Sequence, residues 1–302
     1  MKEVIKAPPR KWFYPIISAP FFLLMLLPMP VLYVISDFLR FLGYKVFGYR
    51  KKVVIENLKK SFPDKDEKWI EDIAWKFYQN LFDVIIETLK MLTISKSALS
   101  KRVVSNGTGL IEEYKKKNQS FILVGGHNGN WEWGGQFMHI LGYKMGVLYH
   151  PLSSKWFDWL MYFQRTRFEL QPIPMNSTLK IMLAAKNDFH CYAFIADQTP
   201  SSENCHWMNF LNQDTPVFMG PEKIAKKFNY PIVFCDLYRV GRGKYELNYK
   251  LVSDSPKDEP DFVITERHTQ FLEQQIQQQP EAWLWSHRRW KHKRKISIDK
   301  II

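Results

Sequence analysis

Two side chains that can transfer a proton stand close together in the segment His127-Asn-Gly-Asn-Trp-Glu132. A neutral imidazole is well suited to accept a proton near neutral pH, and a nearby carboxylate can fix its tautomer and stabilise the imidazolium that forms. If a helix begins near Asn130, His127 lies in the loop before it and Glu132 in its first turn, so the two side chains can converge. The spacing therefore predicts a general base and its orienting partner.

The residues before this segment indicate how it is held. Phe121–Val124 is an apolar run that predicts a buried strand, and Gly125 and Gly126 after it allow the backbone to turn sharply. Loops at the carboxyl ends of strands in open α/β sheets commonly carry reacting groups. This placement favours catalysis over a chance His and Glu on a solvated face.

Rival chemistries have little support in the sequence. It contains neither the G-x-S-x-G elbow of serine hydrolases nor the H-E-x-x-H motif of zinc peptidases. Cys191, Cys205 and Cys235 are too few and too irregularly spaced for a disulfide framework. The pairs His190-Cys191 and Cys205-His206 lack the usual spacing of structural zinc ligands, so we expect no metal site.

Predicted strands and helices alternate along the chain on both sides of the His127 segment. Further strands are predicted at residues 147–149, 192–195, 232–235 and 245–251. Helical spacing of apolar residues predicts helices at 53–60, 66–92 and 261–279. The pattern predicts an α/β fold with a mainly parallel or mixed central sheet flanked by helices.

The N-terminal part of the chain has a different composition. Residues 12–35 include no charged side chain, and this stretch is long enough to cross a hydrocarbon core of ~30 Å. Basic residues flank it on both sides: Lys2, Lys6, Arg10 and Lys11 before it, and Arg40, Lys45, Arg50, Lys51 and Lys52 after it. We therefore expect a membrane anchor over residues 1–52, formed by one hydrophobic anchor helix, and a catalytic domain over residues 53–302.

The anchor is not expected to be a straight helix. It contains Pro15, Pro20, Pro28 and Pro30, each of which removes a backbone donor that lipid cannot replace. A kinked, tilted or re-entrant segment fits better than a straight span. A cleaved signal peptide is less consistent, because no small-residue cleavage site follows. A core helix of a soluble protein is the remaining alternative.

The net charge of +13 and the pI near 9.4 imply an anionic partner. Nucleic acid, anionic lipid headgroups and an acidic carrier protein all meet this requirement, and charge alone does not choose between them. The basic run Lys291–Lys295 is compatible with nucleic acid by composition. Trp283, Trp285 and Trp290 beside it favour an interfacial segment instead.

The segment Gly125–Gly135 resembles the His-x4-(Asp/Glu) box of the glycerolipid acyltransferase superfamily, in particular the lipid A late acyltransferases. Five further blocks follow in the order that this family has: His150-Pro-Leu152, Arg165–Leu170, Phe194–Gln198, Phe218-Met-Gly220 and Trp283–Lys291. The resemblance covers nearly the whole chain.

The resemblance implies direct transfer of a fatty acyl group from a thioester to a lipid hydroxyl, without a covalent acyl-enzyme. His127 would remove the acceptor proton, and Glu132 would hold the imidazole. Backbone donors at residues 128–130 or a nearby positive group would stabilise the oxyanion.

Five further residues are expected to bind substrate: Asn130, Arg165, Arg167, Asp197 and Gln198. Asp197 and Gln198 follow an apolar strand and would orient the acceptor hydroxyl, although an Asp capping the next turn is nearly as consistent with the sequence. One of the two arginines would pair with a phosphate, and the sequence does not decide which.

The expected function is that of a membrane-bound O-acyltransferase that acylates a lipid A precursor. The resemblance implies an acyl carrier protein thioester, or acyl-CoA, as co-substrate, no cofactor, and the cytoplasmic face of the bacterial inner membrane. A lysophospholipid, a glycolipid or an aminolipid is the alternative acceptor. A basic membrane-binding or nucleic-acid-binding protein without catalysis is the alternative class, although we expect no nucleic acid partner.

Overall fold

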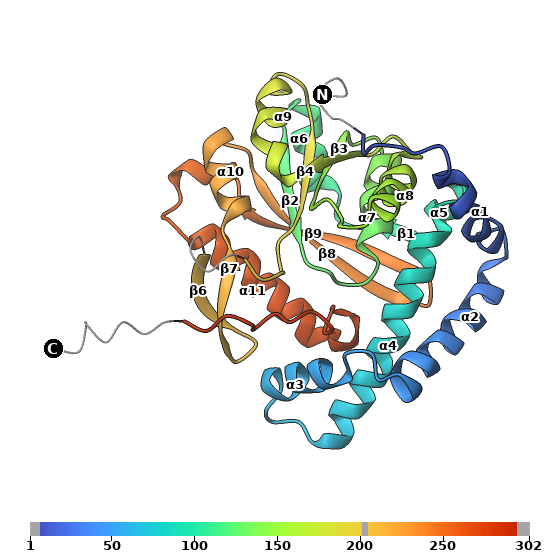
Figure 1. Ribbon diagram of the computed structural model, residues 1–302. Coiled ribbons are helices and arrows are strands. Elements are labelled where there is room, and N and C mark those ends of the chain that lie inside the picture. The colour runs from blue at the N-terminus through green and yellow to red at the C-terminus, as the bar shows by residue number, and fades with distance from the viewer. Residues whose placement is uncertain (1–6, 201–204, 295–302) are drawn as a thin grey trace.

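The computed structural model describes residues 7–200 and 205–294, and it is built around one central sheet (Figure 1). Seven strands form this sheet in the order β1 (Val103–Ser105), β9 (Lys244–Ser253), β8 (Ile232–Gly241), β2 (Phe121–Gly125), β5 (Cys191–Ile195), β3 (Met145–Tyr149) and β4 (Gln171–Pro174). Neighbouring strands run parallel except β8 and β9, which form an antiparallel pair. The predicted α/β fold with a mixed central sheet is confirmed.

Helices cover both faces of the sheet. They are α3 (Lys51–Ser61), α4 (Glu67–Lys90), α5 (Lys96–Ser100), α6 (Gly109–Lys116), α7 (Trp131–Ile140), α8 (Lys155–Thr166), α9 (Thr178–Ala184), α10 (Gly220–Phe228) and α11 (Val263–Gln278). Short 3-10 turns occupy Met175–Ser177, Pro256–Asp258 and Pro280–Ala282. The three predicted helices correspond to α3, α4 and α11, and the Asp66 side chain caps α4 by accepting from the Trp69 backbone N–H at 2.8 Å.

The central strand β2 shows why the sheet needs helices on both sides. It is buried at every position, and its alternate side chains belong to different cores. Ile122 and Val124 share a core with Ile264 of α11, whereas Phe121 and Leu123 share one with Ile111 of α6. Such strands read as continuous apolar runs, which is why β2 is recognisable in the sequence.

The predicted strands all occur, but four others were not predicted. The edge strand β4 contains Pro172 and Pro174, which are tolerated only where the backbone N–H needs no ladder partner. β1 has three residues. A separate antiparallel hairpin, β6 (Cys205–Phe210) and β7 (Gln213–Phe218), turns at Leu211 and Asn212, both with positive φ.

The N-terminal apolar stretch forms two helices, α1 (Tyr14–Met25) and α2 (Met29–Phe41), with a π-helical turn at Leu42–Val46. No single helix among the described residues is long and apolar enough to cross a membrane; α1 and the segment Met29–Val46 meet the length and composition criteria only together, at a bend of 108°. This corrects the single anchor helix and agrees with the expected kink. Lys2 and Lys6 of the expected basic flank lie outside the described residues.

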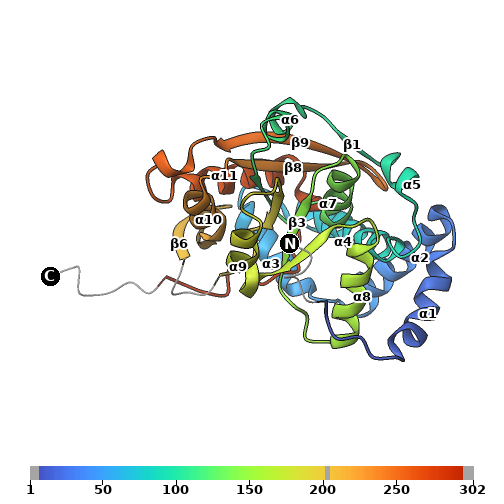
Figure 2. The ribbon, with the colours of Figure 1, turned by 90° about the horizontal axis from the view of Figure 1, so that it is seen from above.

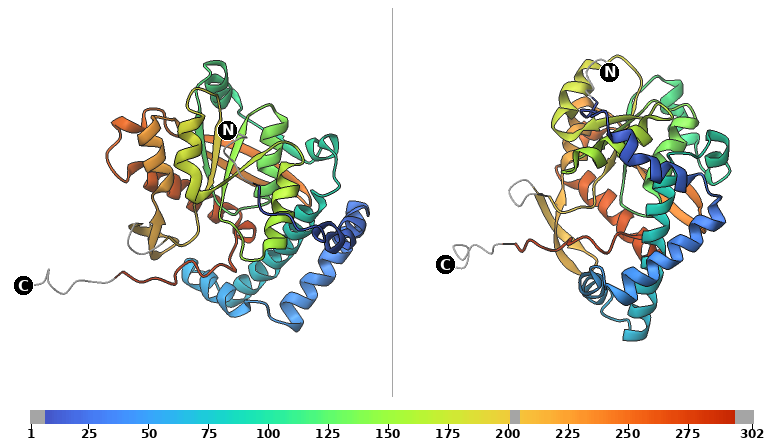
Figure 3. Two further views of the ribbon diagram at one scale, coloured as in Figure 1. Left: turned by 45° about the horizontal axis from the view of Figure 1, so that its top comes forward. Right: turned by 45° about the vertical axis from the view of Figure 1, so that its right-hand side comes forward.

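The helix α2 packs along the long helix α4, and α1 packs against α4 and beside α8, as Figures 2 and 3 show. The break between them leaves backbone carbonyls without helical partners. Lys90 of α4 donates to the Met25 and Leu27 carbonyls at 2.6 and 2.9 Å, and the Thr93 hydroxyl donates to Met25 at 2.5 Å. The bend is therefore held by the end of α4 and the residue Thr93 that follows it.

Candidate active site

Strand pairing places His127 beside Asp197. β2 and β5 are parallel neighbours in which Gly125 pairs with Ile195, so the residues two positions later meet at the carboxyl edge of the sheet. Gly126 permits this approach, since a Cβ atom there would lie 3.1 Å from Asp197 Oδ2 and 2.6 Å from a methyl group of Leu272. Two segments far apart in the sequence thus bring a base and a carboxylate together.

Asp197 fixes the orientation of the imidazole. Its Oδ1 lies 2.6 Å from His127 Nδ1, and its Oδ2 accepts the His127 backbone N–H at 2.7 Å. Because an ionised carboxylate only accepts hydrogen bonds, Nδ1 carries the proton and the lone pair of the neutral ring lies on Nε2. Trp131 packs edge-on against the ring with a centroid distance of 4.8 Å. His127 Nε2 is therefore the ring nitrogen that can take a proton from a substrate.

The surroundings of Asp197 keep its carboxyl group ionised. Burial alone would raise the pKa of its carboxyl group, but the charge and hydrogen bonds of His127 and the hydrogen bond from Trp283 outweigh burial and lower the pKa to about 2. Trp283 Nε1 donates to Oδ2 at 2.8 Å. Asp197 thus holds the imidazole rather than the acceptor hydroxyl that the sequence suggested.

Glu132 does not hold the imidazole, which corrects the predicted pair. Although the structure describes both side chains, no hydrogen bond joins His127 to Glu132. Instead Arg165 of α8 clamps the Glu132 carboxylate through Nη2 and through Nε at 3.0 Å. Burial would raise the pKa of Glu132, but the Arg165 charge and hydrogen bonds prevail and lower it. Glu132 is close to His127 in sequence, but it lies on α7, and its side chain is directed toward Arg165 of α8 instead of toward the imidazole.

Asn130 has a structural position, not a substrate-binding one. Its side chain is fully buried, accepts from the Trp133 N–H at 3.0 Å as the cap of α7, and donates to Glu87 at 2.8 Å. Glu87, fully buried, also accepts from the Tyr245 hydroxyl at 2.7 Å. The Gly129 N–H, one of the expected oxyanion donors, is engaged by the Ala282 carbonyl at 3.1 Å.

Of the remaining predicted residues, Gln198 lies in the site and Arg167 lies outside it. Gln198 is exposed, with its amide nitrogen 3.4 Å from His127 Nε2. Arg167 donates to the carbonyls of Met91 and Ile94 beyond the end of α4, so it anchors a turn. Of the two arginines, Arg165 is therefore the one that lines the site.

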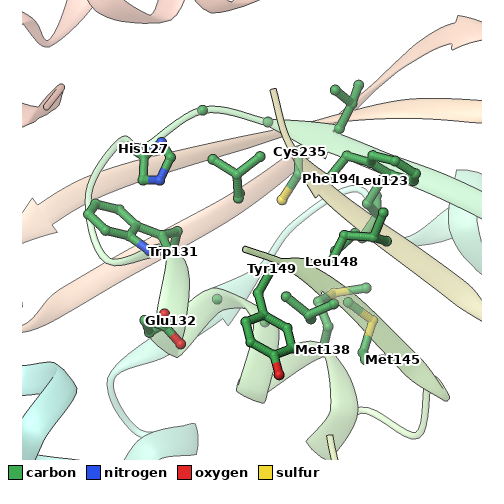
Figure 4. A pocket seen from close by; sticks show the side chains of 18 of the residues that line it. Leu123, His127, Trp131, Glu132, Met138, Met145, Leu148, Tyr149, Phe194 and Cys235 are labelled. Atoms are coloured by element: carbon green, nitrogen blue, oxygen red, sulfur yellow. The ribbon is translucent and has the colours of Figure 1, made fainter. Parts of the chain in front are cut away.

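A cavity of about 330 Å³ opens beside His127 and extends between the sheet and α7. His127, Trp131 and Glu132 gather at one end of it (Figure 4). The other end is apolar and is lined by Leu123, Met138, Met145, Leu148 and Phe194. A site that joins a polar end to an apolar one suits a substrate with a reactive polar group on a hydrocarbon chain.

Comparison with known proteins agrees with this chemistry. A family model described as bacterial lipid A biosynthesis acyltransferase matches residues 6–292. The chain belongs to this acyltransferase family. The lipid A biosynthesis lauroyltransferase of Escherichia coli (strain K12) is 24% identical over 94% of this chain and 92% of that protein. The lipid A biosynthesis acyltransferase of Haemophilus influenzae is 24% identical over 94% and 91%, and the E. coli myristoyltransferase is 20% identical over 82% and 76%.

One solved structure resembles this acyltransferase distantly. The crystal structure of the 1-acyl-sn-glycerophosphate acyltransferase PlsC from Thermotoga maritima has a TM-score of 0.37 and 13% identity, covering 84% of this chain and 97% of that chain. A likeness at this level assigns no substrate.

Sequence reasoning missed two side chains that shape the site of this acyltransferase. Trp283, at 2% exposure, bonds to Asp197, and Glu87 holds the cap of α7. Trp283 lies in a block that the sequence indicated as interfacial. Its burial beside β5 depends on how the chain returns after α11, which no local pattern reveals. The local signal for Glu87 is an acidic residue among apolar ones near the end of α4.

Proposed function

We propose that this protein transfers a fatty acyl group from an acyl carrier protein thioester to a hydroxyl group of a lipid A precursor. The observation that carries the proposal is the His127 imidazole, oriented by Asp197, at the polar end of an apolar cavity. A base beside an apolar cavity suits a reaction in which one substrate is a hydrocarbon chain. Family membership supports the choice of acceptor.

His127 acts as the general base. Its Nε2 takes the proton of the acceptor hydroxyl while that oxygen attacks the thioester carbonyl, so that a C–O bond forms. The C–S bond then breaks, and the imidazolium returns the proton to the leaving thiolate. Asp197 stabilises the imidazolium between the two steps, because its carboxylate stays ionised and bonded to Nδ1. His127 ends as it began, and no acyl-enzyme forms.

Glu132 and Arg165 supply a fixed charge pair at the same polar end. Arg165 uses Nε and Nη2 on Glu132, and among the described residues its Nη1 has no hydrogen-bond partner. An arginine held in this way can donate a hydrogen bond to an anionic or carbonyl oxygen without moving. We assign to Arg165 the binding of a substrate phosphate, and to Glu132 the role of holding Arg165.

The acyl chain occupies the apolar end of the cavity. Met138 and Met145 lie there together with leucines, and flexible thioether side chains accommodate hydrocarbon of varied shape. We assign the donor role to an acyl carrier protein, whose acidic surface complements the net charge of +13, and acyl-CoA is the alternative donor.

Residues 1–52 attach the enzyme to the cytoplasmic face of the inner membrane. The helices α1 and α2 bury one side against α4 and α8, yet their outer sides expose large apolar residues such as Leu23 (68%), Val34 (68%) and Phe38 (60%). Monomeric soluble proteins rarely show such a surface. With Arg10 and Lys11 exposed beside it, this surface suits insertion into an anionic bilayer.

Acyl transfer in detergent tests the proposal directly. Purified enzyme with acyl carrier protein thioesters and a tetra-acylated lipid A precursor should yield a penta-acylated product by mass spectrometry, with acyl-CoA as a poorer donor. Transfer to a lysophospholipid, glycolipid or aminolipid instead would replace the proposed acceptor. No transfer to any lipid would contradict the enzyme assignment.

Vesicle flotation tests the membrane contact separately. Wild-type protein should float with vesicles that contain anionic lipid, and a Leu23→Asp/Phe38→Asp variant should float less. A matched variant on an exposed side chain of α9, Leu183→Asp (52% exposed in the wild type), should float like wild type, because α9 lies far from α1 and α2 in Figure 1. Equal flotation of all three proteins would contradict the proposed contact.

A further inference from the structure

The two loops that carry the candidate catalytic pair are both bonded to one segment near the end of the chain, residues 282–289, which follows α11 (red in Figure 1). On the His127 side, Asn128 forms an antiparallel bridge with Trp283, and Gly129 donates to the Ala282 carbonyl at 3.1 Å. On the Asp197 side, the Thr199 hydroxyl donates to the Arg289 carbonyl at 2.8 Å. We call residues 282–289 the clasp.

Within the clasp, the Trp283 side chain reaches the pair itself. Its indole is 2% exposed, and Nε1 lies 2.8 Å from Asp197 Oδ2. An indole N–H only donates, so it fixes Oδ2 and leaves Oδ1 for His127 Nδ1. The only other hydrogen bond to Oδ2 among the described residues comes from the His127 backbone N–H.

We propose that Trp283 is a positioning residue for the Asp197–His127 pair: its indole N–H sets the orientation of the Asp197 carboxylate and limits its basicity. This inference rests on the proposed function of the site. Without the donor, Asp197 becomes a stronger acceptor toward His127 and loses one of the bonds that hold its plane. The imidazolium is then favoured over the neutral base, and fewer molecules have the productive geometry.

Trp285 provides a matched control. It is 0% exposed and contacts Trp283 edge-on with ring centroids 4.7 Å apart, so the two indoles share one environment. Its Nε1 donates to the Pro280 backbone carbonyl at 2.6 Å instead of to a carboxylate. Replacing either ring removes a similar buried volume and one hydrogen bond, but only Trp283 is bonded to Asp197.

The experiment compares Trp283→Phe with Trp285→Phe in the full-length enzyme. For Trp283→Phe we expect kcat to fall about tenfold, as for loss of a hydrogen bond to a charged group, with KM unchanged. We expect the acidic limb of the pH–rate profile to move to higher pH by roughly half a unit. For Trp285→Phe the limb should stay at the wild-type position.

A second replacement separates positioning from packing. Incorporation of benzothienylalanine at position 283 keeps the two-ring shape and replaces the N–H with sulfur, so a variant that folds like wild type still lacks the donor. It should show the same kinetic change as Trp283→Phe. Wild-type kinetics in the folded analogue, an unmoved or lowered acidic limb, or equal changes at positions 283 and 285 would overturn the proposal.

A readout without substrate keeps this test independent of the proposed reaction. In protein with isotopically labelled histidine, the His127 signal, assigned with His127→Gln, should titrate with a higher midpoint when Trp283 is replaced by the analogue. A shifted midpoint in an enzyme with no acyl transfer would support the coupling and reject the function. An unshifted midpoint in an active enzyme would reject the coupling alone.

Discussion

The site contains two carboxylates of low exposure, Asp197 behind His127 and Glu132 on the cavity wall, and they differ in their partners. Asp197, at the end of β5, is paired with an imidazole, whereas Glu132, at the start of α7, is paired with a guanidinium. Both carboxyl groups have lowered pKa values. A histidine exchanges its proton near neutral pH, and an arginine does not. The first pair can therefore transfer a proton, and the second supplies only a fixed charge and a fixed shape.

The elements behind the two pairs differ in the same way. His127 and Asp197 are held by neighbouring parallel strands and the clasp, so their separation is set by backbone pairing. Glu132 and Arg165 join two helices through side chains alone. We therefore expect substitutions in the first pair to affect turnover and substitutions in the second to affect stability and substrate binding.

The strongest test of this division is His127→Ala. Loss of the general base should lower kcat by about 10³-fold while the folded state is retained, since His127 is partly exposed. His206→Ala is the control, because His206 is bonded to Glu266 away from the site. Steady-state kinetics and thermal unfolding measure the two effects. Turnover near the wild-type value in a folded His127→Ala protein would remove the proposed base.

Glu132→Gln should have its main effect on stability. The substitution leaves the largely buried Arg165 charge, whose side chain is 16% exposed, without its partner, which costs about 3 kcal/mol in the free energy of unfolding. Adding Arg165→Met should recover most of that loss, because no charge then remains buried. Denaturant unfolding measures both variants, with Asp72→Asn as a control for an exposed ion pair. A stable Glu132→Gln protein with turnover reduced as far as in His127→Ala would reverse the assigned roles.

Asp197→Asn should lower kcat by about 10²-fold. The amide keeps the shape of the side chain, but it no longer enforces the tautomer with the proton on Nδ1 or stabilises the imidazolium. Asp236→Asn is a control with equal burial, because Asp236 is 1% exposed and pairs with Lys250 on β9. Steady-state kinetics should show a kcat for Asp197→Asn that is lower than that of Asp236→Asn by most of this factor. Equal kcat values would mean that Asp197 has only a structural role.

Much of the fold follows from the sequence, but the partner of His127 does not. The run Phe121–Val124 predicts β2, and an apolar strand before Asp197 predicts β5. Their adjacency depends on the order of strands in the sheet, which the crossover helices decide. Glu132 looked like the partner because it is near in sequence. Nearness in sequence, however, says little across the start of a helix, where a side chain can face another helix.

The acid stability of the protein should also measure the strength of the Asp197–His127 pair. The pKa of Asp197 is lowered from 3.8 to about 2, so its ionised form stabilises the folded state above pH 3.8, and this contribution is lost as the pH falls through 2. The shift corresponds to about 2 kcal/mol. Between pH 4 and 2, wild-type protein should therefore lose more stability than Asp197→Asn. Denaturant unfolding at several pH values measures the difference, and parallel losses would contradict the strength of the pair.

Gln198→Ala should have the smallest effect, and it tests whether Gln198 acts together with His127 and Asp197. Gln198 is exposed, and its amide nitrogen lies 3.4 Å from His127 Nε2, so it contacts the nitrogen that receives the acceptor proton without fixing it. Loss of a weak, solvated contact costs about 0.5 kcal/mol. We expect KM for the lipid acceptor to rise about twofold with kcat unchanged, which initial-rate kinetics can resolve. A loss of kcat as large as that of Asp197→Asn would make Gln198 part of the proton-transfer pair, because only a group that orients the base has such an effect.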